Sequence, residues 1–164
     1  MYNDASLALI PSAVGDGVVY NARPVEVLGA ELVTNGDFTG GTTNWTLGAG
    51  VAYGSNNIAF TSSSSNTSNS TPSLDISKMY LVTFDISNYA AGSIHSNLGG
   101  TVSGSEHSSN GSKVDYIYTN SSNNILYLTS TGFSGTIDNV SVTEVGESVE
   151  GRDCTINNLA RLIS

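Results

Sequence analysis

Two histidines and three carboxylates are the side chains in this sequence that could support acid–base or metal chemistry. His95 and His107 stand apart in Gly- and Ser-rich surroundings and lack the paired spacing of metal ligands. Glycoside hydrolysis needs two carboxylates about 5–10 Å apart. Asp85, Glu106 and Asp115 are of the required type, but their spacing selects no pair. We therefore expect no catalytic residue, and a hydrolase ranks below the binding functions considered below.

The single cysteine, Cys154, adds no further chemistry. One cysteine excludes an intramolecular disulfide, and no histidine stands beside it in the sequence to activate the thiol. An intermolecular disulfide stays open, but nothing in the sequence favours it. We expect an inert thiol.

The charge balance excludes two classes of partner. Five Lys and Arg face 14 Asp and Glu, which gives a net charge of -9. Binding to nucleic acid or to anionic lipid needs clustered cations, and the five here are scattered along the chain. The apolar run 7–10 ends at Pro11 and is far shorter than the roughly 20 residues of a membrane span. We expect no nucleic-acid partner and no membrane contact.

Alternation of apolar and polar residues predicts an all-β fold. Only 12% of the residues are charged, and 18 are glycine, which favours strands and turns over helices. In 80–87, every second residue is apolar, as in a strand with one buried face. Segments 114–119 and 125–129 show a similar pattern and are predicted to pair as a hairpin. Weaker strands are expected at 31–34, 57–61, 94–98 and 137–145, with surface loops at 62–70 and 103–112.

The chain divides into three zones that differ in their pattern of apolar and polar residues. Residues 1–29 carry short apolar bursts broken by prolines and are expected to form an extended arm. Residues 30–146 hold the predicted strands. Residues 147–164 end in an apolar stripe at helical spacing, which predicts a short helix. Such a helix is not stable alone and must pack on the sandwich or on a partner. The arm and the end segment are expected to dock on partners through Leu7, Leu9, Ile10, Val18, Val19, Tyr20, Ile156, Leu159, Leu162 and Ile163.

Two motifs resemble those of a known family. The segment 31–38, ELVTNGDF, is followed by Trp45, and the segment 135–142 reads GTIDNVSV. Together they are similar to the opening and closing motifs of jelly-roll carbohydrate-binding modules of the CBM4/9-like type. The resemblance implies a two-sheet antiparallel β-sandwich whose first and last strands lie together. It also implies a structural Ca²⁺ near Asp37 and Asp138, although these carboxylates could equally cap turns, and no other cofactor is expected.

The same resemblance raises glycan binding as one function. Such modules stack exposed aromatic rings on sugars, and the candidate rings are Tyr53, Tyr89, Tyr116, Tyr118 and Tyr127. Tyr116 and Tyr118 share a strand face with Val114, however, so we favour packing in the core or on the face of the sheet for these two.

The beginning of the chain carries a second resemblance. Residues 3–13 and 17–24 look like the opening of structural proteins in tailed bacteriophages, particularly marine ones. This resemblance implies a non-enzymatic virion protein, either a capsid decoration (cement) protein or a small tail or fibre component. Its expected partners are the major capsid protein or tail proteins. It would assemble in the host cytoplasm, form homo-oligomers such as a trimer, and expose the jelly roll on the virion surface. The alternative is a module that recognises host-surface glycan.

Overall fold

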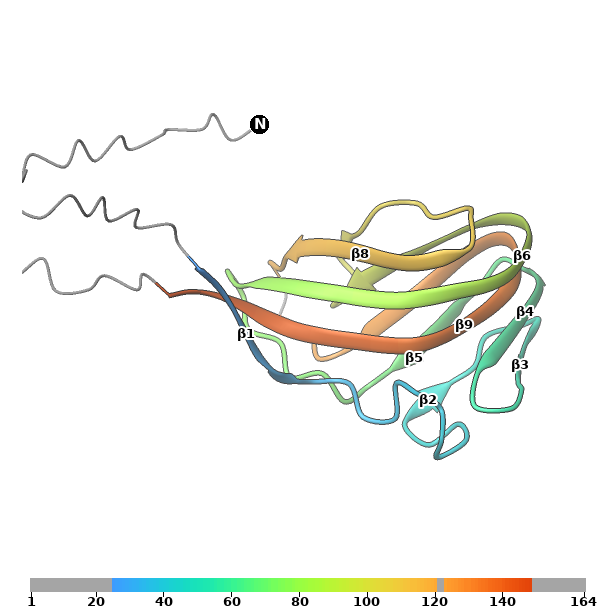
Figure 1. Cartoon of the computed structure of the whole chain (residues 1–164), viewed down its shortest axis with the longest axis horizontal. Helices are drawn as coiled ribbons and strands as arrows, with labels where there is room; N and C mark the ends of the chain where they lie inside the picture. Colours follow the sequence, from blue (N-terminus) through green and yellow to red (C-terminus); the bar gives the residue numbers. More distant parts are fainter. Residues whose placement is uncertain (1–24, 121–122, 149–164) are drawn as a thin grey trace, which may run out of the picture. The chain divides into compact units, whose positions relative to one another are not determined.

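The computed structural model describes residues 25–120 and 123–148, and these residues form strands without a helix. They make one antiparallel sheet that curls strongly into a half-barrel (Figure 1). Contacts group Leu28–Gly146 into one compact unit. Its strands are β1 (Val25–Glu31), β2 (Trp45–Thr46), β3 (Val51–Tyr53), β4 (Ile58–Ser63), β5 (Asn66–Asn69), β6 (Met79–Leu98), β7 (Val102–Ser103), β8 (Gly111–Tyr118) and β9 (Leu126–Ser148). The helix expected within 147–164 lies outside the described residues.

Two long strands organise the sheet. β6 has 20 residues and β9 has 23, and they pair with each other from Met79↔Val145 to Leu98↔Leu126. Both strands bend near the middle, where Gly92 (φ 73°) faces Gly132 (φ 57°). A Cβ at Gly92 would lie 2.3 Å from the carbonyl of Gly132, so only glycine permits this approach. Because of this bend, each strand runs through both halves of the curl.

The two halves of the curl have different neighbours. In the first half, β8 pairs with residues 79–86 of β6, and β1 pairs with β9 on the other side. In the second half, β7 pairs with the end of β6, and residues 126–129 of β9 pair with β5, which in turn pairs with β2. β4 pairs with β9 near the bend and carries β3. Since β1 and β9 are neighbours, both ends of the compact unit lie on adjacent strands.

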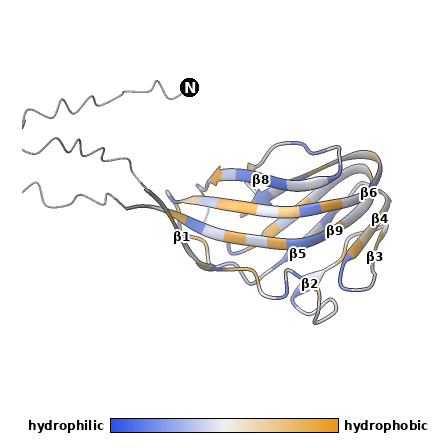
Figure 2. Ribbon diagram, viewed as in Figure 1, coloured by the Kyte–Doolittle hydropathy of each residue, from blue (hydrophilic) through white to orange (hydrophobic). Residues whose placement is uncertain are grey.

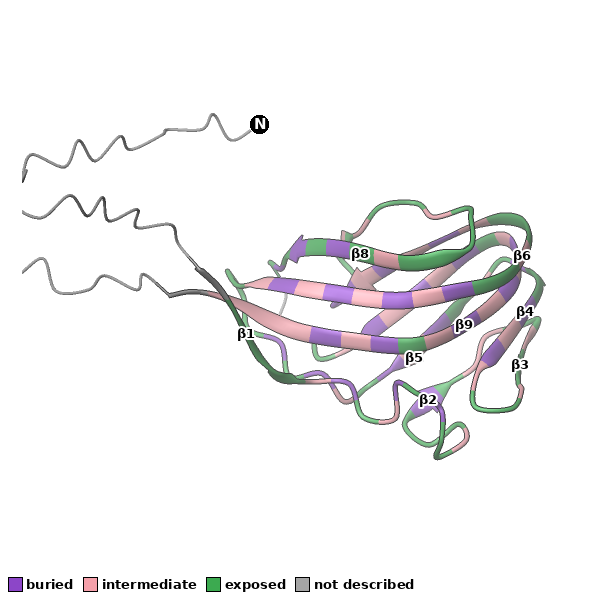
Figure 3. Cartoon of the chain, viewed as in Figure 1, coloured by how far each residue is buried: buried purple, intermediate pink, exposed green. Residues whose placement is uncertain are grey.

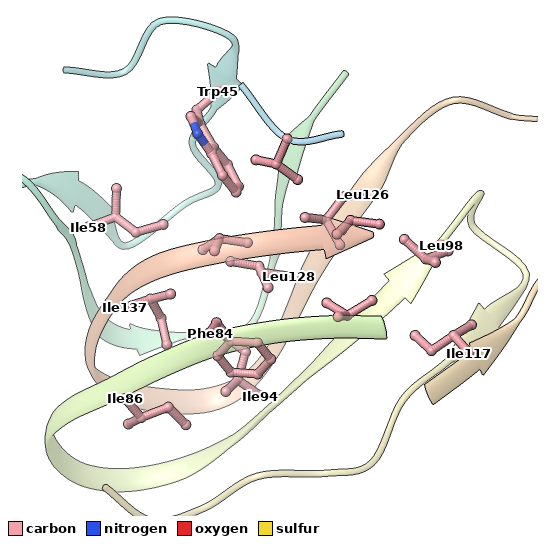
Figure 4. Close-up of a cluster of buried hydrophobic side chains, with 14 of the residues drawn as sticks. Trp45, Ile58, Phe84, Ile86, Ile94, Leu98, Ile117, Leu126, Leu128 and Ile137 are labelled. Carbon is pink, nitrogen blue, oxygen red and sulfur yellow. The ribbon is translucent and has the colours of Figure 1, made fainter. Parts of the chain in front are cut away.

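The core lies inside the curl, as predicted for 80–87. Tyr80, Val82, Phe84 and Ile86 are at most 2% exposed, and buried and partly exposed residues alternate along β6 (Figure 3). Hydrophobic and polar residues likewise alternate along β6 and β9 (Figure 2). Figure 4 shows the side chains from both halves meeting in one cluster, which includes Trp45, Ile58, Phe84, Ile86, Ile94, Leu98, Ile117, Leu126, Leu128 and Ile137.

The predicted hairpin between 114–119 and 125–129 is wrong. β8 pairs with residues 79–86 of β6, whereas the beginning of β9 pairs with β5 and with residues 95–98 of β6. Alternation defines the buried face of a strand but not its neighbour. Here Ile117 of β8 and Leu126 and Leu128 of β9 enter one core from strands that do not pair with each other.

Two smaller predictions also need correction. The segment 62–70, expected as a surface loop, contains β5 and the end of β4, and Ser63, Thr67 and Asn69 within it are buried. Hydrogen bonds satisfy these polar side chains: Asn69 Nδ2 donates to the Thr34 carbonyl at 3.2 Å. The predicted strand 31–34 is misplaced, because β1 covers Val25–Glu31 and shares only Glu31 with the prediction.

The two sequence motifs contact each other. The Val140 N–H donates to the Gly36 carbonyl at 2.9 Å. A Cβ at Gly36 would lie 1.8 Å from the Val140 carbonyl oxygen, so the two backbones touch directly. Asn35 (φ 61°) holds the loop that follows, because its amide donates to two carbonyls and accepts the Gly40 N–H. Trp45 closes this end of the core against Phe38, with ring centroids 4.9 Å apart.

Candidate functional site

A hollow of about 270 Å³ lies on the second half of the curl. Alternation turns Leu126 and Leu128 of β9 into the core, which directs Tyr127 and Thr129 to the other face. The register places Asn97 of β6 directly beside Tyr127. The lining residues are Asn66, Asn97, Gly100, Tyr127 and Thr129.

The hollow combines one aromatic ring with amides and a hydroxyl. Gly100 (φ 78°) lies against the Tyr127 ring, where a Cβ would be 3.7 Å from the ring edge. Asn97 Nδ2 donates to Ser103 Oγ at 3.0 Å. Asn97 Oδ1 is buried and has no hydrogen-bond partner among the described residues. Such an unsatisfied acceptor is costly, so it favours a ligand that brings a donor.

A histidine–carboxylate pair borders the same face. His95 pairs in register with Thr129, which pairs with Asn66. His95 Nδ1 lies 2.8 Å from Glu106 Oε1. A hydrogen bond from Ser93, and then the His95 contact, lower the pKa of Glu106 below its ordinary value despite some desolvation. The carboxylate is therefore charged at neutral pH beside the hollow.

A buried polar network fixes the segment that carries Glu106. The Asp115 carboxylate is 2% exposed and accepts from Ser96 Oγ at 2.8 Å and from the Ser105 N–H at 2.9 Å. His107 Nε2 lies 3.2 Å from both Asp115 oxygens. Ser, His and Asp are together here, but the carboxylate stands between the other two. The Ser96 hydroxyl therefore donates to the carboxylate and not to the histidine, unlike in a hydrolytic triad.

Asp115 also explains why the core prediction for Tyr116 and Tyr118 is wrong. Asp115 and Ile117 are buried, so alternation sends Val114, Tyr116 and Tyr118 outward, where they are 54–55% exposed. The hydrogen-bond network stabilises the buried Asp115 carboxylate, a type of group that composition alone would place on the surface. The alternation was recognised in the sequence, but the buried and exposed faces were assigned the wrong way round.

The remaining tyrosine candidates are dispersed. Tyr53 on β3 is 43% exposed, and its hydroxyl contacts Asn56. Tyr89 donates to the Gly92 carbonyl at 3.0 Å and packs on Phe133, so it supports the bend. Tyr127 alone lines the hollow, and Tyr116 and Tyr118 lie on the outer face of β8.

The carboxylates expected to bind calcium accept hydrogen bonds from neighbouring residues, Asp37 in a turn and Asp138 within β9. Asp37 Oδ1 accepts from the N–H and hydroxyl of Thr39, and Asp138 Oδ1 accepts from the Asn139 N–H. Within 25–120 and 123–148, no three His, Cys, Asp or Glu side chains lie together as metal ligands. A Ca²⁺ here would need backbone carbonyls for most of its six or more ligands.

A shallower depression lies next to the Gly36–Val140 contact. Its carboxylate already has hydrogen-bond partners within the protein. Glu31 projects into it and accepts from the N–H groups of Val33 and Val142 and from the Ser141 hydroxyl. The third hydrolase candidate, Asp85, accepts from Ser112 and Asn139, and these hydrogen bonds lower its pKa. Asp85, Glu106 and Asp115 thus belong to separate hydrogen-bond networks.

The docking residues named from the sequence, in 7–20 and 156–163, lie outside the described residues. No helix long and apolar enough to cross a bilayer occurs in the described part of the chain. No protein-family model matches the sequence, and no curated protein is significantly similar to it.

Proposed function

We propose that this protein is a non-enzymatic structural component of a tailed-phage virion, a decoration (cement) protein or a small tail or fibre component. One observation supports this best: both ends of the compact unit lie on adjacent strands, β1 and β9. Segments 1–24 and 149–164 therefore attach at one end of the unit. Two docking segments can then hold the unit at that end while the remaining faces stay exposed.

In this proposal the curled sheet is a two-sheet jelly roll. The bends at Gly92 and Gly132 support it, since each long strand contributes to both halves around one core. The partners are the major capsid protein or tail proteins, and the location is the virion surface.

Deletion of 1–24, which leaves β1 intact, tests the docking role. The matched control is the full-length chain, and the readout is binding to purified capsids and to isolated tails. Loss of binding, with an unchanged melting temperature, is the expected result. Equal binding by both chains would refute the docking role, and the preferred particle distinguishes a capsid from a tail component.

A second candidate function is recognition of host-surface glycan, and the Tyr127 hollow favours it. A flat ring beside amide and hydroxyl groups offers both stacking and hydrogen bonding. The Glu106 charge at the border disfavours anionic sugars, so we expect neutral ones.

Binding of the full-length chain to a glycan array tests this function. Tyr127→Ala should weaken binding about tenfold or more, which corresponds to about 1.4 kcal/mol. Tyr53→Ala, an exposed tyrosine on β3, is the matched control and should bind normally. No binding to any bacterial polysaccharide, or equal loss in both variants, would remove this candidate.

A further inference from the structure

The sequence contains the dipeptide Asn-Gly twice, at 35–36 and at 110–111. Asparagine is a chemically labile residue, because the backbone nitrogen that follows it can attack its side-chain amide and close a five-membered ring. Glycine in the next position favours this attack, since it has no Cβ to obstruct the ring. The structure places the two dipeptides in opposite environments, which predicts different reactivities for the same chemical group.

Asn35 is held in a conformation that opposes ring closure. Its side-chain amide makes three hydrogen bonds within the loop 40–43, at 2.8–3.0 Å. Gly36 lies against the backbone of Val140, where a Cβ would be 1.8 Å from the carbonyl oxygen. The Gly36 nitrogen cannot approach the Asn35 side chain unless these contacts break.

Asn110 lies exposed in the bend that precedes β8. Its Oδ1 accepts the Tyr89 N–H at 2.9 Å. Its main-chain carbonyl accepts Lys113 Nζ at 3.1 Å, and the same Nζ donates to Ser109 Oγ at 3.0 Å. Gly111 has φ 104°, and a Cβ there would meet nothing within 4 Å. Space is therefore open around Gly111, and both carbonyl groups of Asn110 accept hydrogen bonds.

The two donors act on the two groups that react. Ring closure requires the Gly111 nitrogen to lose its proton and to attack Asn110 Cγ. A cation on the Asn110 carbonyl withdraws electrons from the peptide bond to Gly111, which eases the loss of this proton. An N–H on Oδ1 stabilises the negative charge that develops on this oxygen during the attack.

We propose that Asn110 is a self-modification site, at which Lys113 and the Tyr89 N–H promote conversion to aspartate and isoaspartate. The Gly111 nitrogen bonds to Asn110 Cγ, the bond from Cγ to Nδ2 breaks, and ammonia leaves with the proton from the Gly111 nitrogen. Water then opens the ring at either of its two carbonyls, which gives aspartate from one and isoaspartate from the other. Each conversion adds one negative charge to a chain of net charge -9. Since ammonia is lost, the modified fraction grows with the age of the protein.

Peptide mapping by mass spectrometry tests the proposal on the full-length chain after incubation in mildly alkaline buffer. In the folded protein, Asn110 should convert about tenfold or more faster than Asn35, whose three hydrogen bonds must first open. In urea, which removes the fold, the two sites should convert at similar rates. Aspartate and isoaspartate at position 110 are separated by chromatography, and both should form.

Substitution of Lys113 tests the internal promotion. Lys113→Gln should slow the conversion of Asn110 about fivefold, because a charged donor makes a stronger hydrogen bond than a neutral one. Lys113→Arg keeps the charge and should convert nearly as fast as wild type. Lys78→Gln removes another exposed lysine, which pairs with Glu144, and is the matched control with an unchanged rate. Equal melting temperatures of Lys113→Gln and wild type show that the fold is intact.

Three results would each overturn the proposal. One is conversion of Asn110 no faster than that of Asn35 in the folded protein. Another is slower conversion of Asn110 in the folded protein than in urea, since the fold would then protect this site. The third is an equal rate in Lys113→Gln and wild type. Particle binding and glycan binding are measured separately, so these results leave the proposed function untouched.

Discussion

Replacement of Gly36 by alanine tests the contact that joins the two motif segments. The new Cβ would lie 1.8 Å from the Val140 carbonyl oxygen, whereas real Cβ contacts are not closer than 3.0 Å. The two backbones must therefore separate by about 1.2 Å, the difference between these distances. The φ of Gly36 does not lie in the left-handed region, so alanine adds little backbone strain of its own.

The separation removes two stabilising terms. The hydrogen bond from the Val140 N–H to the Gly36 carbonyl contributes about 1 kcal/mol. Val140 is 3% exposed, and partial loss of its burial costs about 1 kcal/mol. We expect Gly36→Ala to lower the free energy of unfolding by about 2 kcal/mol, or the melting temperature by about 8 °C for a unit of this size.

Gly41 provides the matched control. It has φ 69°, and a Cβ there would meet nothing within 4 Å. Gly41→Ala therefore adds only the strain of a left-handed alanine, about 1 kcal/mol. Urea unfolding can be followed through the fluorescence of Trp45, the only tryptophan, which packs beside this loop. If both variants unfold at the same urea concentration, the backbones are not in contact and the reasoning is wrong.

Three further predictions concern the polar networks. Asp115→Ala should cost about 2–4 kcal/mol in urea unfolding, because it leaves buried donors unpaired, whereas Asp75→Ala, at an exposed position, should cost little. The pKa values of Asp85 and Glu106 are lowered on folding. The stability that these two carboxylates contribute is therefore complete above their ordinary pKa values of 3.8 and 4.5. It is lost as the pH falls through the lower pKa values of the folded state. Asp85→Asn and Glu106→Gln should flatten the decline in melting temperature below pH 4.5, and a parallel decline in wild type and variants would contradict this. EDTA should leave the melting temperature unchanged, since the carboxylates proposed for calcium already accept hydrogen bonds from neighbouring residues; a large drop would indicate a bound ion.

Burial along 80–87 could be predicted from the sequence because it follows from the alternation of apolar and polar residues. Tyr80, Val82, Phe84 and Ile86 are buried as expected. Strand pairing could not be predicted in the same way. The turn-rich connection 120–124 suggested a local hairpin, but β6 and β9 each bend at a glycine and serve both halves of the curl. A bend inside a long strand leaves only a weak sequence signal, here Gly92 and Gly132.

The polar part of the candidate site escaped prediction for another reason. Asp115 and Asn69 are buried because specific hydrogen bonds satisfy them, and a sequence shows polarity without showing its partners. The face of β8 that carries Val114 was therefore predicted to be buried, whereas it is the exposed face. Tyr127 was named only as one of five candidate tyrosines, and the sequence did not distinguish it from the other four.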